Sequence, residues 1–187
     1  MMAVTLAKRA FTLDEYHRMV QAGILAESDR VELIRGEIVV MAPIGRRHAG
    51  QVGRLTRLFS LALGERAIVW VQNPLPLGPD SEPQPDVALL RPCADFYVNT
   101  PLRPADVWLA IEVGDTSVAA DRAIKVPLYA EAGLRETWLV DLPGERVEVY
   151  RTPVPEGYRD VRVLQRGQSL TAETFPDLVL SVDEILG

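Results

Sequence analysis

The segment from Val107 to Val113 restricts the fold most, because it is short and, apart from Glu112, entirely apolar. This pattern predicts a strand inside a sheet. Side chains alternate across a sheet, so Val107, Leu109, Ile111 and Val113 are expected on one face, and Trp108, Ala110 and Glu112 on the other. An unpaired carboxylate in such a strand costs several kcal/mol or shifts its pKa. Glu112 therefore needs a partner from elsewhere in the chain.

Other predicted helices and strands are interleaved along the chain, without the strict βαβ order of a doubly wound fold. Helices are expected at 12–21, 48–63 and 119–132, with Pro127 bending the third. Strands are expected at 31–34, 38–41, 67–71, 86–90, 107–113, 136–140 and 147–150, followed by one or two edge strands and a short helix in the tail. The fold class is thus α/β or α+β, with a mixed sheet flanked by helices, an N-terminal helix and a β-hairpin. We expect residues 1–187 to form a single domain.

Composition narrows the class of protein. A chain of 187 residues, 48% of them hydrophobic, can form a core without disulfides or a structural metal. The single cysteine, Cys93, excludes an internal disulfide framework and favours a reducing compartment, so we expect a cytoplasmic protein. No secretory signal or membrane-spanning run is expected. The net charge of −6 argues against nucleic-acid binding through a bulk positive field, although local basic patches remain possible.

Two acidic residues are candidates for a metal site. Asp86 opens an apolar strand directly after a proline-rich loop, and Glu112 lies in the strand described above. If the two strands pair, both carboxyl groups can converge at one end of the sheet, where they suit Mg²⁺ or Mn²⁺. We expect the backbone carbonyl of Val113 to be a third ligand. In the alternative interpretation, Glu112 pairs with an arginine and Asp86 only caps its strand.

Lys125 is one of only two lysines in the chain, the other being Lys8. It lies on the helix that follows the strand of Glu112, so its ammonium group can reach back to the same end of the sheet. The alternative is a surface ion pair with Asp121, four residues earlier on the helix.

An ordered set of motifs covers nearly the whole chain. It comprises Gln84-Pro85-Asp86-Val87, Ile111-Glu112-Val113, the run from Asp121 to Tyr129, Gly133, the run from Glu136 to Asp141 and, upstream, Glu32, Gly36, Met41-Ala42-Pro43 and His48. This set resembles the Uma-type putative restriction endonuclease family. That family is similar to the PD-(D/E)xK nucleases, so the resemblance implies a restriction-endonuclease-like mixed sheet.

The resemblance also implies roles for individual residues. Asp86 and Glu112 would be the two acids, but the usual lysine position two residues after Glu112 holds Gly114. The role of that lysine would pass to Lys125, on the following helix. A second departure is Asp115-Thr116-Ser117, where family members commonly show a Ser-Pro-Ser type of turn and only Ser117 matches.

Further residues are expected to support this site or to bind substrate, namely Glu32, His48, Asp121 and Tyr129. His48 either touches a phosphate at the positive end of its helix or lies in a solvated turn. Tyr129 either supports Lys125 or is ordinary helix packing. The arginine edge formed by Arg47, Arg54 and Arg57 either follows a nucleic-acid backbone or is a solvated helix face.

Two functions are compatible with these features. The first is a Mg²⁺- or Mn²⁺-dependent endodeoxyribonuclease that hydrolyses DNA phosphodiester bonds. The presence of all three polar residues, Asp86, Glu112 and Lys125, favours this function. The second is a catalytically silent binding or interaction module with a nuclease fold, favoured by the acidic net charge. In either case we expect nucleic acid as the partner, no membrane association, and a homodimer that pairs through edge strands.

Overall fold

The computed structural model describes residues 8–26 and 28–187. Its helices are α1 (Leu13–Gln21), α2 (Arg46–Leu63), α3 (Val118–Ala120), α4 (Val126–Glu131) and α5 (Val182–Leu186), with the short turns η1 (Gly64–Arg66), η2 (Pro104–Asp106) and η3 (Asp121–Lys125). The strands are β1 (Val31–Ile34), β2 (Glu37–Val40), β3 (Ile68–Val71), β4 (Val87–Leu90), β5 (Val107–Gly114), β6 (Glu136–Asp141), β7 (Arg146–Val154), β8 (Gly157–Gln165), β9 (Ser169–Ala172) and β10 (Phe175–Ser181).

Six of these strands form the central sheet in the order β3-β4-β5-β6-β7-β8. Only β5 and β6 run parallel, and the helical segment from α3 to α4 provides the crossover between them. The other neighbours are antiparallel. The sheet is therefore mixed and flanked by helices, which confirms the predicted fold class.

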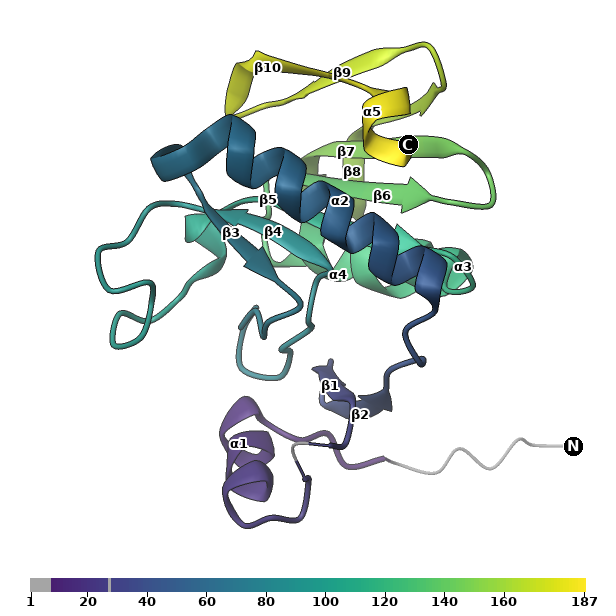
Figure 1. Ribbon diagram of the computed structural model, residues 1–187. Helices are drawn as coiled ribbons and strands as arrows, with labels where there is room; N and C mark the ends of the chain where they lie inside the picture. The colour runs from purple at the N-terminus through teal and green to yellow at the C-terminus, as the bar shows by residue number, and fades with distance from the viewer. Residues whose placement is uncertain (1–7, 27) are drawn as a thin grey trace, which may run out of the picture.

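Each face of the sheet has its own core. On one face, α2, α5 and the small sheet of β9 and β10 cover β4 to β7 through apolar residues that include Leu55, Phe59, Trp138 and Ile185 (Figure 1). On the other face, α4 packs against Ala88 and Ala110 through Leu128 and Tyr129. Burial of these apolar side chains holds both layers to the sheet.

The alternation predicted for Val107 to Val113 is correct at one end and wrong at the other. Leu109, Ile111 and Val113 pack on the α2 face as expected. A β-bulge shifts the register, because Leu89 is opposite Leu109 whereas Leu90 is opposite Val107. The extra residue reverses the faces, so Val107 joins the α4 face and Trp108 packs against Phe175 on the α2 face.

The N-terminal helix and hairpin lie beside the central sheet rather than in it (Figure 1). Thr12 caps α1 and forms a capping box with Glu15. The hairpin of β1 and β2 turns at Arg35 and Gly36, which have φ angles of 47° and 75°. The proline-rich loop 73–85 attaches the hairpin to the fold, because the amide of Glu82 donates to the carbonyl of Leu33 at 2.7 Å.

The helix predicted for 119–132 is interrupted by a π-helical turn. Residues Asp121–Lys125 form this turn, η3, between α3 and α4. Pro127 follows at the start of α4, where the absence of an amide hydrogen breaks the regular α-helical pattern. The wider turn places Asp121 and Lys125 differently from the i, i+4 spacing of an α-helix.

The tail contains more strands than predicted. β8 extends the central sheet as its edge strand, while β9 and β10 form a separate two-stranded sheet before α5.

Among the described residues, no helix is both long and apolar enough to span a membrane.

Candidate active site

The register of β4 and β5 brings the two predicted acids together. Val87 is opposite Ile111 in this antiparallel pair, so Asp86 and Glu112 occupy the next opposed positions at the strand end. The amide of Val113 donates to Oδ2 of Asp86 at 2.8 Å, which ties the end of β4 to β5. The convergence expected from the sequence is thus present, and Asp86 does more than cap its strand.

Three donors hold the Asp86 carboxylate in place. Besides the Val113 amide, Nε2 of His48 contacts Oδ2 at 3.0 Å, and Nε2 of Gln72 donates to Oδ1 at 3.2 Å. The hydrogen bond to Asp86 raises the pKa of His48. His48 therefore orients Asp86 from α2, and the solvated-turn alternative for this histidine is wrong.

Glu112 is buried beside several charged groups. Its Oε1 accepts a hydrogen bond from the Tyr129 hydroxyl and lies 3.4 Å from Nζ of Lys125. Burial raises the pKa of Glu112 to about 8, a shift that Lys125 opposes and the Asp86 carboxylate reinforces. Tyr129 thus contacts the acid itself rather than Lys125.

Lys125 joins the acid pair to the N-terminal hairpin. Its Nζ donates to Oε1 of Glu32 at 2.6 Å, and the same Glu32 oxygen accepts the Gln84 amide at 2.6 Å. Burial alone would lower the pKa of Lys125, but the carboxylates of Glu112 and Glu32 together raise it above its ordinary value. The side chain of Lys125 is only 13% exposed, so the predicted alternative of a surface pair with Asp121 is wrong.

Gly114 leaves no room for a lysine at the usual superfamily position. A Cβ atom there would lie 2.9 Å from the Cα atom of Val118, a backbone atom that cannot rotate away. The chain turns from β5 into α3 at this point, so the crowding is a consequence of the crossover. A lysine can reach the acids only from another element, and Lys125 does so from η3.

Asp121 lies at the edge of the same group. The hydroxyl of Ser117 donates to its Oδ2 at 2.6 Å, and burial raises its pKa. Ser117 is the one residue of the 115–117 turn that matches the family pattern, and this contact gives it a role in positioning Asp121.

These side chains open into a pocket of about 470 Å³ between the hairpin, α2 and the α3–η3 segment. All the predicted polar site residues except the buried Tyr129 line it, namely Glu32, His48, Asp86, Glu112, Asp121 and Lys125. Sequence reasoning missed Arg30 and Gln72, which also line it. Only the position of Gln72 at the end of a predicted strand could have indicated its role, whereas no sequence signal distinguishes Arg30 from the other arginines.

The donor set is compatible with a hard divalent cation. Asp86 and Glu112 provide carboxylate oxygens at one pocket wall, and Mg²⁺ typically takes one or two protein carboxylates and completes its shell with water and phosphate. Within residues 8–26 and 28–187, no group of three or more His, Cys, Asp or Glu side chains is placed to hold a metal. Asp86 and Glu112 would therefore leave the other coordination positions of such a cation to solvent and substrate.

Comparison with solved structures identifies the class of fold. The chain is similar to the protein described as "Crystal structure of a putative nuclease belonging to DUF820 from Anabaena variabilis ATCC 29413". The match has a TM-score of 0.70 and 17% sequence identity, and covers 94% of this chain and 97% of the other. The fold is thus the one found in that protein.

The family follows from the sequence itself. The model of the Uma2 family, described as "Putative restriction endonuclease", matches residues 13–183. The chain belongs to the Uma2 family, which confirms the resemblance noted from the motifs and suggests a nuclease function with a nucleic-acid substrate. No curated protein matches the chain.

Proposed function

We propose that this protein is a metal-dependent endonuclease that hydrolyses DNA phosphodiester bonds with Asp86, Glu112 and Lys125. One observation carries the proposal: Lys125 lies 3.4 Å from Glu112, and Glu112 is opposite Asp86 in the sheet register. All three line one pocket of about 470 Å³. Family membership agrees with this function.

Asp86 and Glu112 would hold Mg²⁺ or Mn²⁺, with the Val113 carbonyl as a further ligand. When bound, such a cation polarises the phosphoryl oxygen and lowers the pKa of a bound water. His48 and Gln72 keep the Asp86 carboxylate oriented, while Tyr129 orients Glu112 through its hydroxyl. Each acid is thus positioned by a neighbour on another element.

Lys125 acts in this proposal as a charged donor. Glu112 and Glu32 raise its pKa, and its Nζ donates to the Glu32 carboxylate at 2.6 Å, so the side chain is an ammonium group at neutral pH. It can orient a water molecule or neutralise the negative charge that develops on the phosphate. Glu32 serves as the positioning residue that holds this ammonium in the pocket.

Cleavage of plasmid and single-stranded DNA with Mg²⁺ or Mn²⁺ tests the function. The wild type is expected to cut in the presence of either cation and to stop in EDTA, and Asp86→Ala is expected to be inactive. Asp160→Ala is the matched control, because Asp160 pairs with Arg162 on β8 and does not line the pocket.

Equal cleavage by wild type and Asp86→Ala would indicate a contaminating nuclease and overturn the proposal. An inactive wild type that still binds DNA would instead support the catalytically silent binding module. The two functions are separated by measuring cleavage and binding on the same preparation.

A further inference from the structure

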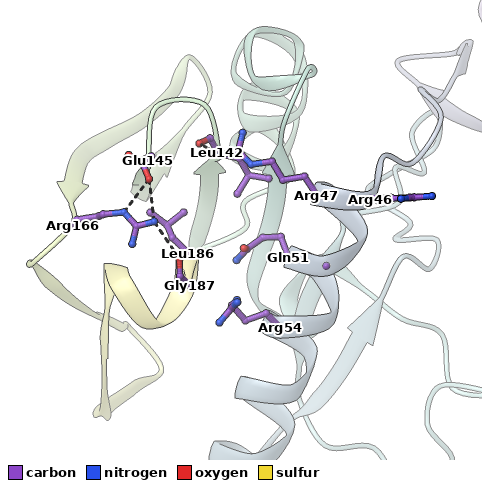
Figure 2. A pocket seen from close by; sticks show the side chains of 10 residues that line it. Arg46, Arg47, Gln51, Arg54, Leu142, Glu145, Arg166, Leu186 and Gly187 are labelled. Atoms are coloured by element: carbon purple, nitrogen blue, oxygen red, sulfur yellow. Dashed lines mark hydrogen bonds and ion pairs between the residues drawn. The ribbon is translucent and has the colours of Figure 1, made fainter.

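A second pocket lies on the other side of the α2 N-terminal half and is lined by arginines (Figure 2). Its volume is about 330 Å³. Arg47 and Arg54 extend into it from α2, and Arg166 faces them from the turn between β8 and β9. The end of α5 forms its base at Gly187. We call this cavity the arginine pocket.

The arginine pocket carries a net positive charge in a protein whose net charge is −6. Arg46, Arg47, Arg54 and Arg166 line it, but the Arg46 side chain points away from the others (Figure 2), so three guanidinium groups accompany one acidic side chain, Glu145. Arg166 is neutralised by ion pairs to Glu145 at 3.1 Å and Asp183 at 3.0 Å. Arg54 forms no ion pair with any other described residue, so its charge is available to a ligand.

The Arg54 guanidinium lies beside the end of α5, at the pocket floor. A side chain at Gly187 would overlap the Arg54 guanidinium, so the arginine packs directly against the end of α5. Gln51, one turn earlier on α2, donates to the carbonyl of Ile185 and fixes α5 against α2.

The arginine pocket adjoins, along α2, the pocket lined by Asp86, Glu112 and Lys125, which we call the acid pocket. Gly45 and His48 line the acid pocket, whereas Arg46 and Arg47 line the arginine pocket. The link is Arg47, whose Nη1 lies 3.5 Å from Oδ1 of Asp115, itself part of the acid pocket wall. A polyanion that enters the acid pocket can therefore continue over Arg47 toward Arg54.

We propose that the arginine pocket binds a backbone phosphate of the same nucleic-acid strand whose cleaved linkage lies in the acid pocket. This inference rests on the proposed function, because it assigns the path of that function's substrate. Guanidinium groups bind phosphate oxygens through paired hydrogen bonds, which suits Arg47 and Arg54 to this contact. The arrangement also explains how an acidic protein holds a polyanion: a local basic track leads to the carboxylates.

Binding without cleavage tests the inference. We would measure fluorescence anisotropy of a labelled 20-nucleotide single strand in EDTA, across a series of salt concentrations, for the wild type and Arg54→Gln. Each phosphate contact contributes about 0.7 to the slope of log K against log salt on single strands. Arg54→Gln is expected to bind several-fold more weakly and to lower this slope by about 0.7. Arg54→Lys, which keeps the charge, should retain the slope.

Arg57→Gln is the matched control. Arg57 is exposed on α2, three residues beyond Arg54, and does not line the arginine pocket. Its variant should bind like the wild type. An unchanged slope in Arg54→Gln, an equal loss in Arg57→Gln, or no salt-dependent binding by the wild type would each overturn the inference.

The cleavage assay keeps this outcome separate from the proposed function. If the wild type cleaves DNA but Arg54→Gln shows the same salt slope as the wild type, only the phosphate-binding role of the arginine pocket is overturned. A wild type that binds through Arg54 but never cleaves overturns the proposed hydrolysis alone. Thermal unfolding of Arg54→Gln and Arg54→Lys within a few degrees of the wild type confirms that α5 remains attached.

Discussion

Lys125 and Glu112 lie 3.4 Å apart between Nζ and Oε1, although one belongs to a π-helical turn and the other to a central strand. The crossover from β5 through α3 makes this contact, because it returns the chain to the end of the sheet that carries the acids. The contact gives a buried carboxyl a cationic neighbour.

Lys125→Arg is expected to reduce metal-dependent DNA cleavage by about 10²-fold or more, the scale for losing one positioned donor. Guanidinium keeps the charge but is planar and larger than ammonium, so it cannot occupy the same position between Glu32 and Glu112. Steady-state cleavage rates and the melting temperature would be measured together. Lys8→Arg, at an exposed pair with Glu37, is the control and should be silent. Full activity of Lys125→Arg would exclude the assigned role.

Metal binding is expected to depend on both acids. Isothermal titration calorimetry with Mn²⁺ should show weak binding to the wild type, because the substrate phosphate is absent, and loss of that binding in Glu112→Gln. This readout does not require cleavage. Equal heats for the two proteins would exclude a cation between Asp86 and Glu112.

The stability of the metal-free protein should fall as pH rises from about 4.5 to about 8. Over this range Glu112 is ionised in the unfolded chain but keeps its proton in the folded protein, where its pKa is about 8. The folded state therefore binds more protons, and this one group lowers the free energy of unfolding by up to about 1.4 kcal/mol per pH unit. His48, with its raised pKa, contributes in the same direction at the upper end.

Urea unfolding at several pH values in EDTA would measure this dependence. In Glu112→Gln, the free energy of unfolding should depend less on pH between pH 5 and pH 8. This range lies between the ordinary pKa of a glutamate and the raised pKa of Glu112. Glu65→Gln, at an exposed position in η1, should leave the pH dependence unchanged. A slope that is the same in wild type and Glu112→Gln would contradict the burial effect.

Gly114→Ala is expected to destabilise the fold by about 1–3 kcal/mol, the cost of overpacking a fixed site. The new Cβ would lie 2.9 Å from the Cα atom of Val118. Gly53→Ala is the matched control, because nothing lies within 4 Å of its Cβ position on α2. Since alanine favours a helix more than glycine does, the control should gain about 0.5–1 kcal/mol. Equal effects in urea unfolding would show that Gly114 is not crowded.

A homodimer is expected from the exposed edge of the central sheet. β8 forms that edge, and Val161 and Val163 on it are each 49% exposed. Analytical ultracentrifugation should give twice the monomer mass, and Val163→Lys should lower it. Val179→Lys, at an exposed position on β10, should not. A mass near 20.7 kDa for the wild type across micromolar concentrations would contradict dimerisation.

Local patterns in the sequence determined the elements whose stability depends on near neighbours. Thr12 and Glu15 are three residues apart and cap α1 by themselves, and Gly36 supplies the turn of the hairpin. The apolar run before Glu112 predicted a buried strand, whereas the pairing of that strand with the strand of Asp86 was a condition that the sheet register supplies. Hydrogen bonds and alternation within a few residues are sufficient for each of these features.

Tertiary structure alone decided how those elements serve the site. Lys125 and Glu32 are 93 residues apart, and only the docking of the hairpin on loop 73–85 brings them to 2.6 Å. The bulge at Trp108 likewise depends on packing against another element, because Trp108 contacts Phe175 on the α2 face. Long-range contacts of this kind depend on which apolar faces meet, and the free energy of that burial is a property of the whole fold.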